Sequence, residues 1–163
     1  MSSESNAVMG GRRYARSFEE LIVYAKAGGV ALRIFEISKL FPKEEMYSLT
    51  DQIRRASRSM GAQIAEAWGK RRYPRHFVSK LTDADAEQLE TRHWVHVAAS
   101  CGYLTAEQER CFVDDLAEIG RMLHAMIGKA NAFCGPIDPV IREYSAVYYP
   151  TPGTDYLSLE TGH

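Results

Sequence analysis

Proline is scarce in this chain: only six of 163 residues are proline, and four of them follow residue 135. No apolar run approaches the roughly 18 residues that would indicate a membrane span, and the polar first 16 residues do not resemble a signal peptide. The three cysteines, Cys101, Cys111 and Cys134, are odd in number and lack CxxC spacing, which argues against a disulfide framework and a zinc module. These absences predict a cytoplasmic globular protein without contact with a membrane.

Recognisable catalytic and cofactor motifs are also missing. The chain has neither a GxxxxGK nor a GxGxxG loop for phosphate groups. Cys101 follows His93 and His96 in sequence, but no third group is placed to orient a base. Glu90 and His93 form one half of a carboxylate metal motif of helical bundles, and a metal site needs three or four donors. We therefore expect no enzymatic activity, no cofactor and no metal.

Helical signals dominate what is present. The apolar spacing predicts four helices, over residues 18–40, 49–68, 74–101 and 105–135. Capping boxes at Ser17 and Thr105 mark two helix starts, and Pro74 suits the first turn of a third. Gly102 fits the left-handed position that follows a helix end. No stretch alternates with a period of two, so the expected fold class is all-α.

Short connections between four helices favour an antiparallel up-down-up-down four-helix bundle over residues 17–135. Residues 1–16 are expected to be a flexible segment, and residues 136–163 an irregular tail rich in proline and tyrosine. The apolar seams of the second to fourth helices comprise Ile53, Ala56, Met60, Ile64, Ala67, Phe77, Leu81, Ala84, Val95, Ala99, Phe112, Leu116, Ile119, Leu123, Met126, Ile127 and Ala130, with a polar interruption at Gln88.

The first helix has apolar residues on two opposite faces. One face holds Leu21, Ala25, Gly28, Leu32 and Phe35. The predicted subunit interface lies on the other face and consists of Val23, Val30, Ile34, Ile37 and Phe41. A helix that is apolar on two sides is usually covered on two sides, so we expect a homo-oligomer. The alternative is that the C-terminal tail covers the second face.

The net charge of −1 hides an uneven distribution. Residues 1–80 carry 15 basic and 8 acidic side chains, whereas residues 81–163 carry 5 basic and 13 acidic ones. The densest basic stretch comprises Arg54, Arg55, Arg58, Lys70, Arg71, Arg72 and Arg75. Arginine presents a planar fork to phosphate, and clustered cations gain affinity for a polyanion by releasing its counterions. This stretch predicts a surface that binds RNA or DNA without strong sequence preference.

A second interpretation of the basic stretch is intramolecular or intersubunit pairing. Asp83, Glu87 and Glu90 form an acidic stripe on the third predicted helix and could neutralise the arginines. The protein would then be an interaction scaffold, with its basic and acidic stripes joining subunits or a protein partner. The sequence alone leaves both interpretations open.

Several runs of residues together resemble a known family. They are Leu21–Ala27, Phe41–Glu45, Gln52–Ser59, Gln63–Trp68 and Cys101–Leu104. Their order and spacing are similar to those of the small helical proteins encoded in intervening sequences of bacterial 23S ribosomal RNA genes. The resemblance covers roughly residues 18–132.

The resemblance implies a four-helix bundle that assembles as a ring-like homopentamer. Related accessory proteins of diversity-generating retroelements bind nucleic acid and a reverse transcriptase. The resemblance therefore makes nucleic acid and a reverse transcriptase two expected partners of this chain. Gln63 and Ala67 depart from the Asn-Ile-Ala-Glu-Gly pattern of the family. Any role that depends on that asparagine is therefore not carried over to this chain.

Overall fold

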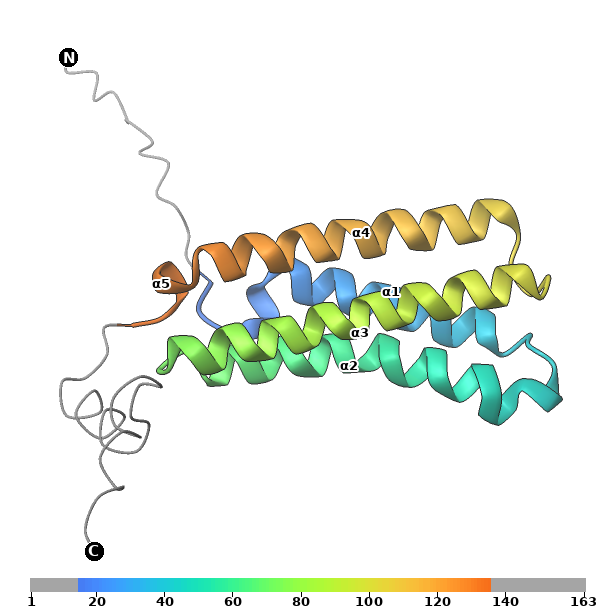
Figure 1. Cartoon of the computed structure of the whole chain (residues 1–163), viewed down its shortest axis with the longest axis horizontal. Coiled ribbons are helices and arrows are strands. Elements are labelled where there is room, and N and C mark those ends of the chain that lie inside the picture. The colour runs from blue at the N-terminus through green and yellow to red at the C-terminus, as the bar shows by residue number, and fades with distance from the viewer. Residues whose placement is uncertain (1–14, 136–163) are drawn as a thin grey trace, which may run out of the picture.

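A computed structural model describes residues 15–135 (Figure 1), and the expectations for residues 1–14 and 136–163 lie outside it. All regular secondary structure in the described part is helical, which confirms the all-α prediction. Its helices are α1 (Ile22–Ser38), α2 (Asp51–Gly69), α3 (Pro74–Ser100), α4 (Ala106–Gly128) and the short α5 (Ala130–Phe133). Single helical turns, η1 (Phe18–Glu20), η2 (Lys43–Glu45) and η3 (Met46–Thr50), precede α1 and α2.

Three of the predicted helix boundaries are confirmed. Pro74 begins α3, where its missing N–H removes no helical hydrogen bond. Gly102 follows α3 with a φ of 78°, which a residue with a side chain rarely adopts. At the start of α4, the Gln108 backbone amide donates to Thr105 Oγ1 at 3.2 Å, and the Thr105 amide donates to Gln108 Oε1 at 2.8 Å. These reciprocal bonds form the predicted capping box.

Two other boundaries differ from the prediction. Ser17 makes no side-chain cap bond: the Glu20 amide donates to the Ser17 carbonyl at 3.3 Å, and the Glu20 carboxylate accepts from the Arg16 backbone amide and from Arg16 Nε. The chain therefore forms the turn η1 first, and α1 begins only at Ile22. The fourth predicted helix is interrupted at Lys129, so that α5 is separate from α4.

The four long helices lie side by side (Figure 1), and each packs on the next along the chain, while α4 also packs on α1. The predicted seams of α2, α3 and α4 form most of the core between them. On α3 the structure buries Ala98 fully, and Ala99 is only partly buried. Gln88, the polar interruption of that seam, is 3% exposed. No helix of the described part has an apolar stretch long enough to cross a membrane.

The predicted interface on α1 is wrong about which side of the helix faces outward. Four of its five residues are buried in the core of this chain and the fifth packs against that core; they are Val23, Val30, Ile34, Phe41 and Ile37. The opposite face carries the exposed residues, with Ile22 68% and Leu32 62% exposed. Leu40, just after the helix, is 84% exposed. Periodicity identifies two apolar faces, but the packing of the other three helices decides which one becomes core.

Candidate nucleic-acid interface

The seven predicted basic residues separate into two groups at opposite ends of α2. Arg54, Arg55 and Arg58 lie in its first half, and the remaining four lie in the turn to α3 and at the start of that helix. At roughly 1.5 Å of rise per residue, the 17 positions from Arg54 to Arg71 correspond to about 25 Å. The basic stretch is therefore two surfaces along one helix rather than one cluster.

The first group surrounds an aromatic ring of α1. We call Phe35, Lys39, Arg54 and Arg58 the Phe35 cluster. The three cationic groups lie 4.5, 5.1 and 5.4 Å from the ring centroid for Lys39, Arg54 and Arg58 respectively. Arg54 Nε also donates to Ser38 Oγ at 2.7 Å. The ring and the hydroxyl hold the two arginines in place without neutralising their charge.

The acidic stripe does not form salt bridges with these arginines in the described part of the chain. Asp83 instead pairs with Lys80 at 3.3 Å, and Glu90 accepts from Trp94 Nε1 at 3.1 Å. Burial raises the pKa of Glu87, nearby Glu90 and Asp83 raise it further, and Arg55 offsets this only in part. The intramolecular pairing considered from sequence is therefore not found between residues 15 and 135.

The second group combines cations with exposed rings. We call residues 70–76, from Lys70 to His76, the Tyr73 turn. Arg71 Cζ lies 3.5 Å from the centroid of the Trp68 ring, and Arg71 Nε donates to the Trp68 carbonyl at 2.8 Å. Tyr73 is 40% exposed, and its ring centroid lies 5.4 Å from that of His76. Arg72 and Arg75 of the same turn are exposed.

The sequence places Tyr73 among the cations of the second group, but the contacts of Phe35 and Trp68 with these cations were not predicted from it. The apolar pattern places Phe35 only on one face of the first helix, although Lys39 follows it by one helical turn, a spacing at which side chains meet. The contacts of Phe35 with Arg54 and Arg58 depend on how α1 packs against α2. Trp68 likewise precedes Arg71 by three residues, and from that spacing the contact between the two side chains could have been predicted.

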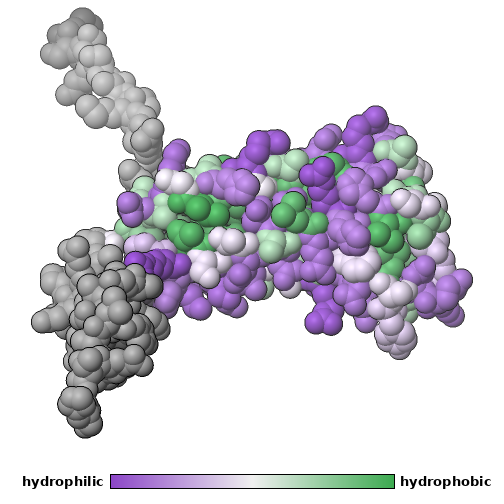
Figure 2. Space-filling model, viewed as in Figure 1, coloured by the Kyte–Doolittle hydropathy of each residue, from purple (hydrophilic) through white to green (hydrophobic). Residues whose placement is uncertain are grey.

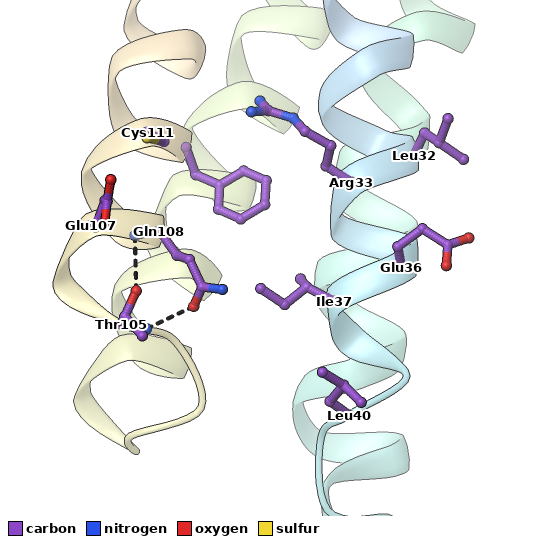
Figure 3. Close-up of a pocket in the computed structure, with 10 residues that line it drawn as sticks. Leu32, Arg33, Glu36, Ile37, Leu40, Thr105, Glu107, Gln108 and Cys111 are labelled. Atoms are coloured by element: carbon purple, nitrogen blue, oxygen red, sulfur yellow. Dashed lines mark hydrogen bonds between the residues drawn. The ribbon is translucent and has the colours of Figure 1, made fainter.

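A groove of about 780 Å³ lies between the C-terminal half of α1 and the start of α4 (Figure 3). Its apolar lining is Leu32, Ile37, Leu40 and Phe112, and its polar lining includes Arg33, Glu36, Thr105, Glu107 and Gln108. Arg33 forms a salt bridge with Asp115 of α4 and lies over the Phe112 ring, with its Cζ 5.0 Å from the centroid.

On the face seen in Figure 2, apolar residues form separate groups among hydrophilic ones.

The histidines and cysteines do not converge on one site. His96 Nδ1 lies 2.6 Å from Glu109 Oε1, and the His93 ring packs edge-on against Trp94. Between residues 15 and 135, no three histidine, cysteine or carboxylate side chains are grouped as a metal site requires. Cys101 and Cys111 are exposed, whereas burial raises the pKa of the Cys134 thiol.

These features define a small all-helical protein whose clustered cations are held against aromatic rings. The chain belongs to the 23S rRNA-intervening sequence protein family, whose model matches residues 19–125. A solved structure of a protein of unknown function from the S23 ribosomal protein family of Bacteroides thetaiotaomicron is 31% identical. The alignment covers 65% of this chain and 98% of that one, with a TM-score of 0.59. No curated protein matches the chain.

Proposed function

We propose that this protein is a non-enzymatic homo-oligomer that binds nucleic acid through a basic surface without strong sequence specificity. Its four long helices form an antiparallel up-down-up-down bundle in the cytoplasm. The observation that carries the proposal is that seven clustered cations, Arg54, Arg55, Arg58, Lys70, Arg71, Arg72 and Arg75, make no salt bridge with residues 15–135.

Phosphate contacts explain why such cations would be left without carboxylate partners. Like charges at neighbouring positions on a helix are destabilising, and Arg54 and Arg58 are four residues apart. A polyanion removes that repulsion and releases counterions when it binds. Contacts of this kind supply affinity but carry no sequence information. Because the family is named for an intervening sequence of 23S rRNA, RNA is the first nucleic acid to test.

The exposed face of α1 supports self-association, and it replaces the interface expected from sequence. Leu32 and Leu40 expose most of their side-chain surface beside the groove. Gly28 and Gly29 lie in the middle of the helix, and a Cβ at either position would meet nothing within 4 Å. Each glycine costs on the order of 1 kcal/mol relative to alanine in a helix, and close approach by a second copy would offset this cost.

A protein-interaction scaffold is the second candidate. The groove between α1 and α4 favours it, because apolar side chains from two helices line an open concave surface. An apolar helix of a partner is a typical occupant of such a groove. The resemblance to retroelement accessory proteins makes a reverse transcriptase one partner to test.

Charge reversal at Arg54 and Arg58 separates the two candidates. Under the nucleic-acid proposal, the double variant Arg54→Glu/Arg58→Glu binds RNA more weakly and keeps its oligomeric state. The plot of log affinity against log salt concentration has a negative slope, and this slope should become less steep by about one for each phosphate that the variant no longer binds. Fluorescence anisotropy and light scattering on the same samples measure both quantities.

The matched control is Arg110→Glu/Arg121→Glu, which makes the same charge change at two exposed positions of α4. The control should retain more affinity than the test variant. Equal losses of affinity in both variants would show that only net charge matters. Dissociation of the oligomer by the test variant, with RNA affinity unchanged, would favour the scaffold instead.

A further inference from the structure

The two basic groups present different chemistry to a nucleic acid. In the Phe35 cluster three cations surround one partly buried ring, at 4.5 to 5.4 Å from its centroid. In the Tyr73 turn, Tyr73 is 40% exposed and its aromatic neighbour is the exposed His76. The first group therefore offers charge alone, whereas the second offers charge and ring surface together.

We infer that the Tyr73 turn binds the unpaired bases of single-stranded nucleic acid. This inference rests on the nucleic-acid binding proposed above and names its substrate class. Bases stack on exposed tyrosine, tryptophan and histidine rings and on arginine planes, and stacking does not depend on base identity. In a duplex the faces of the bases are already covered by their neighbours, so the Tyr73 ring cannot reach them.

Hydrogen bonds on both sides restrain the backbone of Tyr73. The Tyr73 amide donates to the Lys70 carbonyl at 2.9 Å, and the Tyr73 carbonyl accepts from the amides of His76 and Phe77 at 2.9 and 3.0 Å. Phe77 is fully buried in the core and stacks on Phe133. An aromatic ring on such a restrained backbone loses less conformational freedom when a base stacks on it than a ring on a flexible loop would.

Arg71 adds a second flat surface to the same turn. Its guanidinium lies over the Trp68 ring, and its hydrogen bond to the Trp68 carbonyl fixes the orientation. Lys70, Arg72 and Arg75 are exposed nearby and take part in none of the salt bridges of the described residues. A single strand can thus place its phosphates on the cations and a base on Tyr73.

The test compares one RNA in two forms. A fluorescent RNA of about 20 nucleotides, longer than typical single-strand sites, is titrated alone and annealed to its complement at low salt. Tyr73→Ala should weaken binding of the single strand about tenfold and leave duplex binding unchanged. Tyr73→Phe should bind like the unmodified protein, since stacking needs the ring and not the hydroxyl.

Two further variants serve as controls. Tyr47→Ala removes a tyrosine that is 82% exposed in η3, which precedes the start of α2, whereas the Tyr73 turn follows its end. This variant should change neither the affinity for the single strand nor the affinity for the duplex. Arg54→Glu/Arg58→Glu should weaken both forms of the RNA, because the Phe35 cluster contacts only phosphates. Circular dichroism establishes that each variant remains helical.

The outcomes distinguish single-strand binding from nucleic-acid binding in general. If Tyr73→Ala weakens both forms equally, or neither, while the arginine variant weakens both, the single-strand inference is overturned and nucleic-acid binding stands. If neither form binds the unmodified protein at low salt, both proposals fall. Selective loss of single-strand binding in Tyr73→Ala supports the inference.

Discussion

Glycine residues have different surroundings on different helices of this protein. A Cβ placed on Gly120 of α4 would lie 3.1 Å from Gln88 Oε1 and 3.5 Å from Asp85 Oδ1 of α3. A Cβ on Gly61 of α2 would lie 3.6 Å from the Tyr24 ring, an ordinary van der Waals distance. Of these two glycines, only Gly120 has a neighbour that an added Cβ would have to displace.

Alanine substitution at these two glycines should have opposite effects on stability. Gly61→Ala should stabilise the protein by up to about 1 kcal/mol, because alanine favours the helix. Gly120→Ala should destabilise it by about 1 kcal/mol, since the buried Gln88 amide has little room to move. Urea unfolding midpoints at equal m-values measure the difference. Equal stabilisation by both substitutions would show that Gln88 can shift without penalty.

Local signals predicted the residue-scale features that depend only on neighbours in sequence. Pro74, Gly102 and Thr105 occupy the expected helix boundaries because each acts through its own backbone or through a residue three positions away. The Phe35 cluster could not be predicted in this way. It joins α1 to α2, and Arg54 and Arg58 reach the ring only once the two helices pack.

At the scale of single helices, the two predicted capping boxes had different outcomes. Both have a hydroxyl residue followed three positions later by Glu or Gln, as the pattern requires. At Thr105 the chain enters α4 directly after the Gly102 turn, and the side chains cap the helix. At Ser17 the Glu20 amide donates to the Ser17 carbonyl and the Glu20 carboxylate is bound by Arg16, so the capping box does not form.

Removing the hydroxyl of Thr105 should destabilise the protein more than removing the hydroxyl of Ser17. Thr105→Ala should lower the free energy of unfolding by about 1 kcal/mol, because the variant cannot form the cap bond to the Gln108 amide. Ser17→Ala should have a much smaller effect, since Ser17 caps no helix in the structure. Thermal melts followed by circular dichroism compare the two. A greater destabilisation by Ser17→Ala would contradict the assigned start of α1.

The two faces of α1 show what periodicity cannot decide. The spacing correctly separated two apolar faces, but both contain large apolar residues. Val30 and Ile34 became core because α2 and α4 pack on that side, and Leu32 remained exposed. Only the arrangement of the other helices carries this information, so the interface predicted from sequence was placed on the face that is buried within the chain.

At the scale of the whole molecule, the exposed face of α1 is the surface through which we expect copies to associate. Leu32→Glu/Leu40→Glu should shift the protein towards monomer, because two charges would have to be buried at the interface. Leu89→Glu is the control, since Leu89 of α3 is 54% exposed and lies outside the groove. Multi-angle light scattering at micromolar concentration gives the mass of each species. A monomeric unmodified protein would rule out self-association.

The near-balance of charge is also a property of the whole molecule. Cations gather along α2 and the turn that follows it, whereas α3 and α4 carry the excess of carboxylates. None of the seven clustered cations takes part in a salt bridge of the described residues. Other cations do, such as Lys26 with Glu118 and Lys80 with Glu66. The overall charge of −1 thus conceals a surface that remains strongly positive in places.

The salt dependence of RNA binding is the sharpest test of whether the basic surface contacts phosphates. The affinity of the unmodified protein for a single-stranded RNA is measured by anisotropy over a series of salt concentrations. We expect log affinity to fall linearly with log salt concentration, with a slope approaching about −5 when all seven cations take part. Absence of binding at the lowest salt concentration, or an affinity independent of salt, would contradict the proposed nucleic-acid interface.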